Sequence, residues 1–392
     1  MFLVEKKTYF IHNKKKVRFN MKKRFVSDAM PSCLLLCMAL AGFVFLCVFQ
    51  SGCQVTTEGI KVLEAEESLE IQNIAVLDEK SIEVQFNKEV NVKEAKLSKL
   101  DSQEQTSLDA LDENAVSVNG VLSEDEKTVV YEFQESTDIG ELYQLFSEIE
   151  DSRGNSLTFS IPFEGFNNRL PILIITELQG ASGDKTTKGV KTKRCEYIVL
   201  RALTAGNLAG IELYSARYKV LSEYCFPAIE VKAGEHIMIH LRTYEGQDHT
   251  EELGEDLSLD KNNDESWDTI RDLYYENSEP CASKEYDILL LRNKATAKIM
   301  DALLYTLESK KENYSKLAAA EKLATDAGKW KDEPIILEKN LTATTQSLQR
   351  MNSEELFALA EKGELEQDDI TTSKDEWQIG LTLYNAKRTS IY

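Results

Sequence analysis

Proline and glycine are scarce in this chain of 392 residues, which has only 6 Pro and 18 Gly. A chain so poor in both is neither a collagen nor a low-complexity linker. Long hydrophobic runs are also scarce, because Leu34–Phe49 is the one extended apolar stretch, so a polytopic membrane protein is excluded. At about 150 residues per domain, the length allows two or three domains with buried cores.

Catalytic signatures are missing as well. The sequence has no phosphate-binding Gly-x-x-x-x-Gly-Lys loop, no His-Glu-x-x-His and no Gly-x-Ser-x-Gly. Histidine is rare beyond residue 52, where His236, His240 and His249 stand alone. We expect His236 and His240 to face outward from one strand, about 13 Å apart and therefore too distant to share a metal. The sequence predicts no enzyme and no cofactor.

Positive charge is concentrated at the start of the chain. Residues 1–52 have nine Lys or Arg against two acids, which is a net charge of +7. The rest of the chain therefore has a net charge of −28, and the whole chain has −21. This acidity disfavours nucleic acid as a partner, because the body of the protein repels the phosphate backbone.

Residues 1–52 have the pattern of an export leader. The cluster Met21-Lys22-Lys23-Arg24 precedes the apolar run Leu34–Phe49, as the basic and hydrophobic regions of a signal peptide do. Because residues 1–20 add length before this cluster without an evident role, Met21 is an alternative start of the protein. An uncleaved transmembrane anchor is the alternative, because the uncharged stretch from Ala29 to Thr57 is long enough to span a bilayer.

The leader ends in Ser51-Gly52-Cys53, which resembles the bacterial lipobox, although Gln50 stands where an apolar residue is usual. The resemblance implies a lipid on Cys53 that holds the protein at the cell membrane or outer membrane, facing the periplasm or the exterior. Gln54, in place of the Asp that retains some lipoproteins, favours the outer membrane. Residues 53–70 are rich in Glu and are expected to form an acidic tether.

Residues 71–165 alternate between apolar and polar positions in short runs, which indicates strands with one buried face. The segments SIEVQFNKEV at 81–90, KTVVYEF at 127–133 and EIEDSRGNSL at 148–157 resemble the bacterial Ig-like domain. That family implies a β-sandwich that serves as a spacer or a binding module and has no catalytic residues.

Residues 170–392 continue with sequence patterns typical of strands and resemble a lamin-tail domain, which is a second Ig-like sandwich. The resemblance rests on these segments: Ile175-Thr176-Glu177, EYIVL at 196–200, GEHIMIH at 234–240, IMDALLY at 299–305 with Asp301 and Tyr305, and closing segments at 345–350 and 375–377. The expected fold is all-β, with two Ig-like β-sandwiches in tandem.

Two stretches of this second region have helical spacing and are expected to be insertions packed on the sandwich. The first covers about 308–330 and has Gly328 placed to cap its end. The second covers 353–363, begins at a capping box in Asn352-Ser353-Glu354-Glu355 and ends at Gly363. Helices that bind a partner are the alternative.

Three groups of residues are candidate sites. A basic loop opposes the overall charge and is either an anion-binding loop or simply solvated: Lys185, Lys188, Lys191, Lys193 and Arg194. Asp260, Asn262 and Asp264 have the alternating oxygens of a calcium loop, but Glu265 and Arg271 occupy EF-hand positions that need Gly and Glu. Once an EF-hand is excluded, the segment is interpreted either as a looser calcium site or as a solvated acidic loop. Cys195, Cys225 and Cys281 allow one disulfide, whose pairing stays open.

Together these features predict an exported, lipid-anchored envelope protein that acts as a non-catalytic binding or structural module. Its expected partners are the membrane, through the lipid, and a protein or glycan of the envelope. The alternatives are a metal-dependent hydrolase built from scattered acids and a purely structural envelope component.

Overall fold

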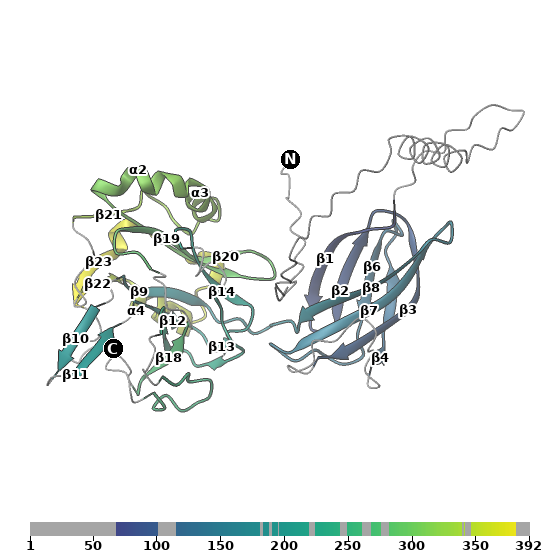
Figure 1. Ribbon diagram of the computed structural model, residues 1–392, viewed down its shortest axis with the longest axis horizontal. Coiled ribbons are helices and arrows are strands. Elements are labelled where there is room, and N and C mark those ends of the chain that lie inside the picture. Colours follow the sequence, from purple (N-terminus) through teal and green to yellow (C-terminus); the bar gives the residue numbers. More distant parts are fainter. Residues whose placement is uncertain are drawn as a thin grey trace, which may run out of the picture. The chain divides into compact units, whose positions relative to one another are not determined.

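The computed structural model describes residues 68–100, 115–180, 183–187, 190–194, 196–218, 224–243, 249–260, 268–275, 282–338, 341 and 346–381. The leader, Cys53 and the tether up to Glu67 lie outside them. The described residues all belong to one compact unit, Ser68–Tyr392. They form mostly β-strands arranged in several sheets, with few helices, which confirms the all-β fold (Figure 1). No helix within these ranges is both long and apolar enough to cross a bilayer.

The first sandwich stacks two four-stranded sheets. One has the order β1-β2-β6-β5 and the other β4-β3-β7-β8. The bounds of these strands are β1 Ile71–Asp78, β2 Ser81–Phe86, β3 Val90–Lys99, β4 Val116–Ser117, β5 Asn119–Leu122, β6 Thr128–Glu132, β7 Leu142–Asp151 and β8 Ser156–Glu164. Alternate residues of both sheets, such as Ile82, Val84, Leu145 and Phe159, form its buried core. The expected period-two pattern therefore sets this core.

The turn between β7 and β8 is held by one carboxylate. Asp151 accepts hydrogen bonds from the backbone N–H groups of Arg153 and Asn155 and from the Asn155 side chain, each 2.9 Å long. Gly154 has a φ of 86°, which favours glycine. The corner expected from Asp-x-x-Gly-Asn is present.

The second sandwich also has two main sheets. One has the order β18-β17-β12-β9-β22-β23 and the other β15-β14-β19-β20-β21. The bounds in the first are β9 Leu173–Gln179, β12 Tyr197–Ala202, β17 His236–His240, β18 Ile270–Tyr274, β22 Gln346–Arg350 and β23 Trp377–Leu381; those in the second are β14 Ile211–Ser215, β15 Tyr224–Cys225, β19 Tyr286–Asn293, β20 Ile299–Leu307 and β21 Ile335–Leu337. Apolar residues from both sheets form one core.

Two small pairs complete the strands of the second sandwich. Strands β13 (Gly206–Asn207) and β16 (Glu230–Val231) pair with each other, and β10 (Gly183–Thr187) pairs with β11 (Val190–Arg194) as a separate antiparallel hairpin.

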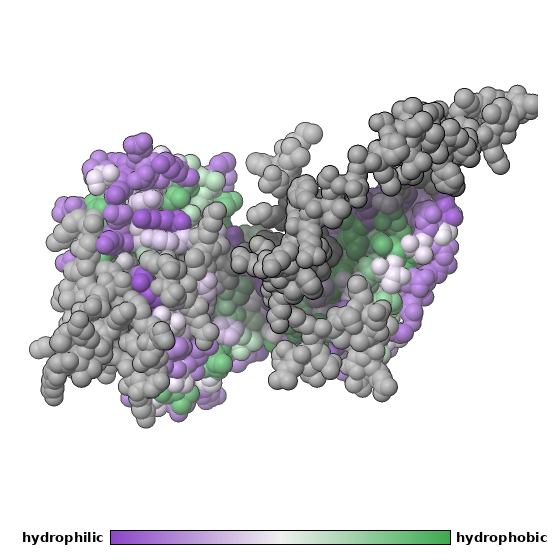
Figure 2. Space-filling view, in the orientation of Figure 1, coloured by the Kyte–Doolittle hydropathy of each residue, from purple (hydrophilic) through white to green (hydrophobic). Residues whose placement is uncertain are grey.

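Helices occur in the second sandwich where they were expected. The first stretch consists of η2 (Glu308–Lys310), α2 (Lys311–Tyr314), η3 (Ser315–Leu317) and α3 (Ala318–Asp326), and Gly328 follows with a φ of 70°. Tyr314, Ala320 and Ala324 join the buried core. The exposed side of these helices is mostly hydrophilic (Figure 2).

The second helix, α4 (Ser353–Glu361), ends before Gly363, whose φ is 71°. Its predicted capping box is wrong, because Asn352 is the N-cap residue and makes no side-chain cap hydrogen bond. Two short turns follow, η4 (Gln367–Asp369) and η5 (Lys374–Glu376), and both have capping boxes of their own.

Candidate functional site

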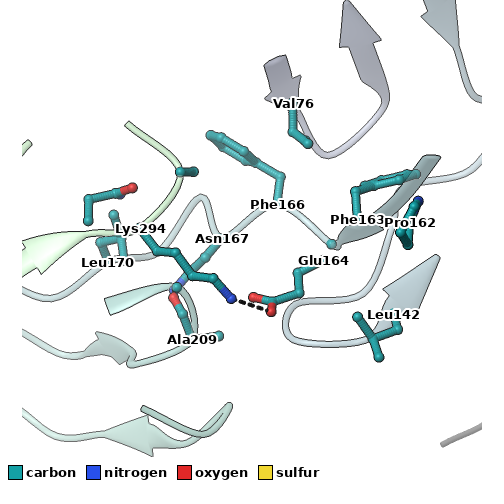
Figure 3. Close-up of a pocket in the computed structure, with 14 residues that line it drawn as sticks. Val76, Leu142, Pro162, Phe163, Glu164, Phe166, Asn167, Leu170, Ala209 and Lys294 are labelled. Atoms are coloured by element: carbon teal, nitrogen blue, oxygen red, sulfur yellow. Dashed lines mark hydrogen bonds and ion pairs between the residues drawn. The ribbon is translucent and has the colours of Figure 1, made fainter. Parts of the chain in front are cut away.

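A cleft of about 360 Å³ opens where the chain leaves β8 and enters the second sandwich (Figure 3). Its walls come from β1, from the start of β7, from the end of β8 and the connection that follows it, and from two turns of the second sandwich. The apolar part of the lining comprises Val76, Leu142, Pro162, Phe163, Phe166, Leu170 and Ala209. Leu142 is 43% exposed, so an apolar ligand group has a surface to pack against.

One ion pair crosses this cleft. Lys294 Nζ lies 2.7 Å from Glu164 Oε1, and each side chain is 43% exposed (Figure 3). Burial by itself lowers the pKa of Lys294, but the hydrogen bond and the charge of Glu164 outweigh it and raise that pKa above its ordinary value. Because both groups are partly solvated, the pair contributes little to stability, about 0–1 kcal/mol. Its groups remain accessible to a ligand.

The Asn167 side-chain amide also lines the cleft but has a structural role, unlike the ion pair. The Asn167 side chain donates to the carbonyl oxygens of Asn207 and Ala209, both at 2.8 Å, and accepts a bond from the Arg169 N–H at 2.9 Å. Asn167 therefore fixes the wall, while Glu164 and Lys294 are the polar groups that can meet a ligand. Apolar walls around a few polar groups are typical of a binding site.

The basic loop predicted from the sequence is a hairpin. Lys185 pairs with Thr192 across β10 and β11, Lys191 pairs with Thr186, and Lys193 pairs with Asp184. Lys188 lies outside the described residues. The prediction of a loop is corrected here, because residues 183–187 and 190–194 pair with each other as an antiparallel ladder.

The calcium candidates are only partly described. Asp260 is 2% exposed, and its Oδ2 accepts a short hydrogen bond from the Tyr274 hydroxyl. Asp260 therefore does not lie in a solvated acidic loop, and that expectation is wrong for this residue, while the looser calcium site stays a prediction. Asn262 and Asp264 lie outside the described residues.

The two histidines of β17 are buried, which corrects the expectation that they face solvent. His240 is fully buried, and its Nε2 lies 2.7 Å from Asp272 Oδ1. His236 is 5% exposed, and burial, together with the Arg201 charge, lowers its pKa to about 3. Residues of segment 249–260 and of α4 contact this outer face of the sheet: His249 lies against the Tyr274 ring, Asp260 accepts the Tyr274 hydroxyl, and the Phe357 ring lies beside Arg201.

The sequence did not predict a row of three hydrogen-bonded pairs on this same face, here called the row of acid pairs, in each of which a tyrosine or histidine contacts a carboxylate. Tyr197 pairs with His240 across β12 and β17, and His240 pairs with Tyr274 across β17 and β18. Each holds a carboxylate: the Tyr197 hydroxyl donates to Glu177, His240 contacts Asp272, and the Tyr274 hydroxyl donates to Asp260. The alternation of β17 and β18 indicates that these residues point away from the core, but it does not indicate which segments of the chain cover them.

Other candidate chemistry is limited in the described part of the chain. There, no group of three or more His, Cys, Asp or Glu is arranged to hold a metal ion. Cys225 is exposed at the end of β15. Cys195 and Cys281 are outside the described residues.

Comparison with known proteins places the second sandwich in a family. A family model described as "TP_1001_2nd: protein second domain" matches residues 171–379, more than half of the chain. The chain belongs to this family. The matched residues begin just before β9 and end within β23, so the family's domain includes the row of acid pairs and both helical insertions.

One curated relative is an uncharacterized protein of Treponema pallidum (strain Nichols). It is 26% identical over 208 residues, a match that covers 50% of this chain and 50% of the relative. The chain thus spans about half the length of the curated relative it matches.

Solved structures give weaker matches. The N-terminal part of the bacterial S-layer protein SbsC aligns at 15% identity over 41% of this chain and 37% of its own, with a TM-score of 0.22. A DUF4876 family protein from Bacteroides thetaiotaomicron VPI-5482 aligns at 10% identity over 74% of this chain and 89% of its own, with a TM-score of 0.28. Scores this low support no argument about function.

Proposed function

We propose that this protein is an exported, lipid-anchored envelope protein that binds a protein or glycan partner without catalysing a reaction. The cleft at the end of β8 carries the binding part of this proposal. It joins an apolar wall to one accessible ion pair, Glu164–Lys294, which suits recognition of a group that is apolar on one side and polar on the other.

The anchoring part of the proposal rests on the sequence. A leader that ends in Ser51-Gly52-Cys53 would place the protein at a membrane, facing the periplasm or the exterior, and the acidic tether would provide reach. The bacterial Ig-like and lamin-tail resemblances belong to this proposal too, since both families serve as spacers or binding modules. The basic hairpin β10–β11 is proposed as a second, anion-binding surface.

Metabolic labelling with palmitate tests the anchor. We expect the full-length protein to incorporate label in bacteria and the Cys53→Ala variant to incorporate none. Cys225→Ala is the matched control, because this exposed thiol lies in the folded body and should not affect labelling. Label that persists in the Cys53→Ala variant would exclude lipidation at this residue.

Binding to isolated envelope material tests the cleft. Leu142→Arg places a charge on the apolar wall and should abolish retention of the purified protein. Leu323→Arg is the control, since Leu323 is a similarly exposed leucine on α3, 51% exposed. Equal retention of both variants would remove the cleft from the proposal, and robust turnover in a metal-supplemented hydrolase panel would favour the enzyme alternative.

A further inference from the structure

An acidic segment covers one edge of the six-stranded sheet. Residues 249–260, here called the strap, run along the outer side of β18 and contain five acids in twelve residues: Glu251, Glu252, Glu255, Asp256 and Asp260. Strand β18 is the last in its sheet, paired in parallel with β17 on its inner side. Its outer backbone groups would bond to a further strand if one were present.

The strap bonds to these outer groups largely through side chains. The Glu252 N–H donates to the Asp272 carbonyl at 3.0 Å, which is a backbone bond between the two segments. The Asp272 N–H donates to Glu252 Oε2 at 2.9 Å, and the Tyr274 N–H donates to Glu251 Oε1 at 3.2 Å. Two carboxylates therefore stand where the carbonyl oxygens of a neighbouring strand would lie.

The covered edge presents mainly hydrogen-bond donors. Besides the N–H groups of Asp272 and Tyr274, Arg271 Nη1 donates to the carbonyl oxygens of Glu252 and Gly254, the latter at 2.7 Å. The Tyr274 hydroxyl donates to Asp260. Arg271 is 2% exposed, and Glu235 holds its Nε at 2.7 Å, so this donor is fixed in place. A ligand for this edge must be extended and rich in acceptors.

The strap occupies this edge at an electrostatic cost. Glu252 is fully buried, and its carboxylate also accepts the N–H group of Leu259 at 3.1 Å. Burial and the nearby Asp272 carboxylate nevertheless raise the pKa of Glu252, which means that these N–H bonds do not fully offset the loss of hydration. A competing segment would not have to replace an ideal contact.

We propose that the outer edge of β18 is a binding site for an extended acidic peptide, and that the strap occupies it as an internal pseudo-ligand. This inference goes beyond the binding role proposed above, because it names a second site and a class of partner. It does not involve the lipid or the cleft, so its failure would leave the labelling and Leu142 tests unaffected.

A labelled peptide with the sequence of residues 249–260 tests the proposal against the purified full-length protein. Glu251→Ala combined with Glu252→Ala removes both carboxylates from the strap and leaves the edge intact. We expect this variant to bind the peptide at least tenfold more tightly than the unmodified protein, measured by fluorescence anisotropy. Glu255→Gln is the matched control, because Glu255 is an exposed strap acid, 92% exposed, and should bind as the unmodified protein does.

A scrambled peptide of the same composition separates recognition from charge. The acidic body repels any acidic peptide at long range, so charge alone would not favour either peptide. The site is supported only if the peptide with the native sequence binds and the scrambled peptide does not. Equal binding of both peptides, or no binding by a folded double variant, would overturn the proposal. Self-association of the variant without peptide binding would also overturn it, since the strap would then only protect the edge from pairing between copies.

Hydrogen exchange keeps the test valid if the double variant does not fold. In the unmodified protein, the amides of Asp272 and Tyr274 should exchange by local release of the strap, faster than those of the central strand β12. Excess peptide should slow them at least threefold, because it competes for the released edge. Exchange that the peptide does not change would contradict the proposal.

Discussion

Asp301 and Arg350 form a fully buried ion pair that joins the two sheets of the second sandwich. Asp301 Oδ2 on β20 lies 2.8 Å from Arg350 Nη1 on β22, and neither side chain has any exposed surface. The same oxygen accepts the Ile175 N–H of β9 at 2.7 Å. Burial raises the pKa of Asp301, while the Arg350 charge acts in the opposite direction.

Removing one member of this pair should be costly. Asp301→Leu or Arg350→Met alone leaves an uncompensated charge in the core and should lower the free energy of unfolding by about 3–5 kcal/mol. The double variant should lose clearly less than the sum of the two, because no charge is left behind. Urea unfolding followed through the fluorescence of the buried Trp330 and Trp377 measures this. Additive losses would show that the two charges are not coupled.

Asp287 should make the second sandwich less stable as pH rises. It is fully buried, and burial raises its pKa to about 7, although Ser215 donates to it at 2.7 Å. Because the folded pKa lies above the ordinary value of 3.8, the stabilising contribution is complete below that value and is lost as pH rises through about 7. The loss is at most about 1.4 kcal/mol per pH unit.

Asp287→Asn should therefore flatten the dependence of unfolding free energy on pH between about 5 and 8. The neutral amide cannot ionise, so the variant should be more stable than the unmodified protein at the alkaline end. Asp326→Asn on the exposed surface of α3 is the control and should keep the slope. An unchanged slope in the Asp287 variant would mean that this carboxyl does not titrate in that range.

Lys329 should stabilise the fold by holding the segment 367–370 against the second sandwich. Its Nζ donates to the carbonyl oxygens of Gln367, Asp368 and Ile370 at 2.7, 3.2 and 3.0 Å, and the residue is 2% exposed. Lys329→Met leaves these acceptors without their donor and should cost about 3 kcal/mol. Lys331→Met, two positions on and exposed, should cost far less. Similar unfolding midpoints for both variants would refute this role.

Asp151 should make the first sandwich sensitive to acid. The hydrogen bonds from Asn155 lower the pKa of this carboxyl, so its stabilising contribution is present above the ordinary value of 3.8 and is lost as pH falls below it. Asp151→Ala should lower the melting temperature at neutral pH and remove that part of the acid dependence. Calorimetric scans at neutral and acidic pH check both results; an equal shift at every pH would contradict the electrostatic role.

Much of the local structure was predictable from the sequence. The alternation of Ile82, Val84 and Phe86 gave β2, and Gly328 and Gly363 marked the ends of both helical insertions. These features depend on near neighbours along the chain, since a left-handed residue ends a helix whatever lies beyond it. Asp301, Tyr305 and Arg350 all lie in motif segments, but the sequence does not indicate that Asp301 contacts Arg350 or that the Tyr305 hydroxyl donates to the Ser283 carbonyl.

The candidate sites were much less predictable. The cleft depends on β1, β7, β8, a connection and two distant turns, and Glu164 and Lys294 are separated by 130 positions. Likewise, nothing near His240 indicates that Asp272 lies beside it or that the strap covers both. The expectation that His236 and His240 face solvent failed because alternation reports which residues avoid the core, not what covers the opposite face.

The sequence by itself determined the all-β fold, the helix ends, the turn at Asp151 and the charge contrast between the leader and the body, because each follows from short-range patterns or from composition. Only the tertiary structure decided which polar groups are buried, which acids meet which donors, and which sheet edge is covered. The physical reason is that burial and hydrogen bonding depend on contacts between segments far apart in the chain, and no local pattern records those contacts.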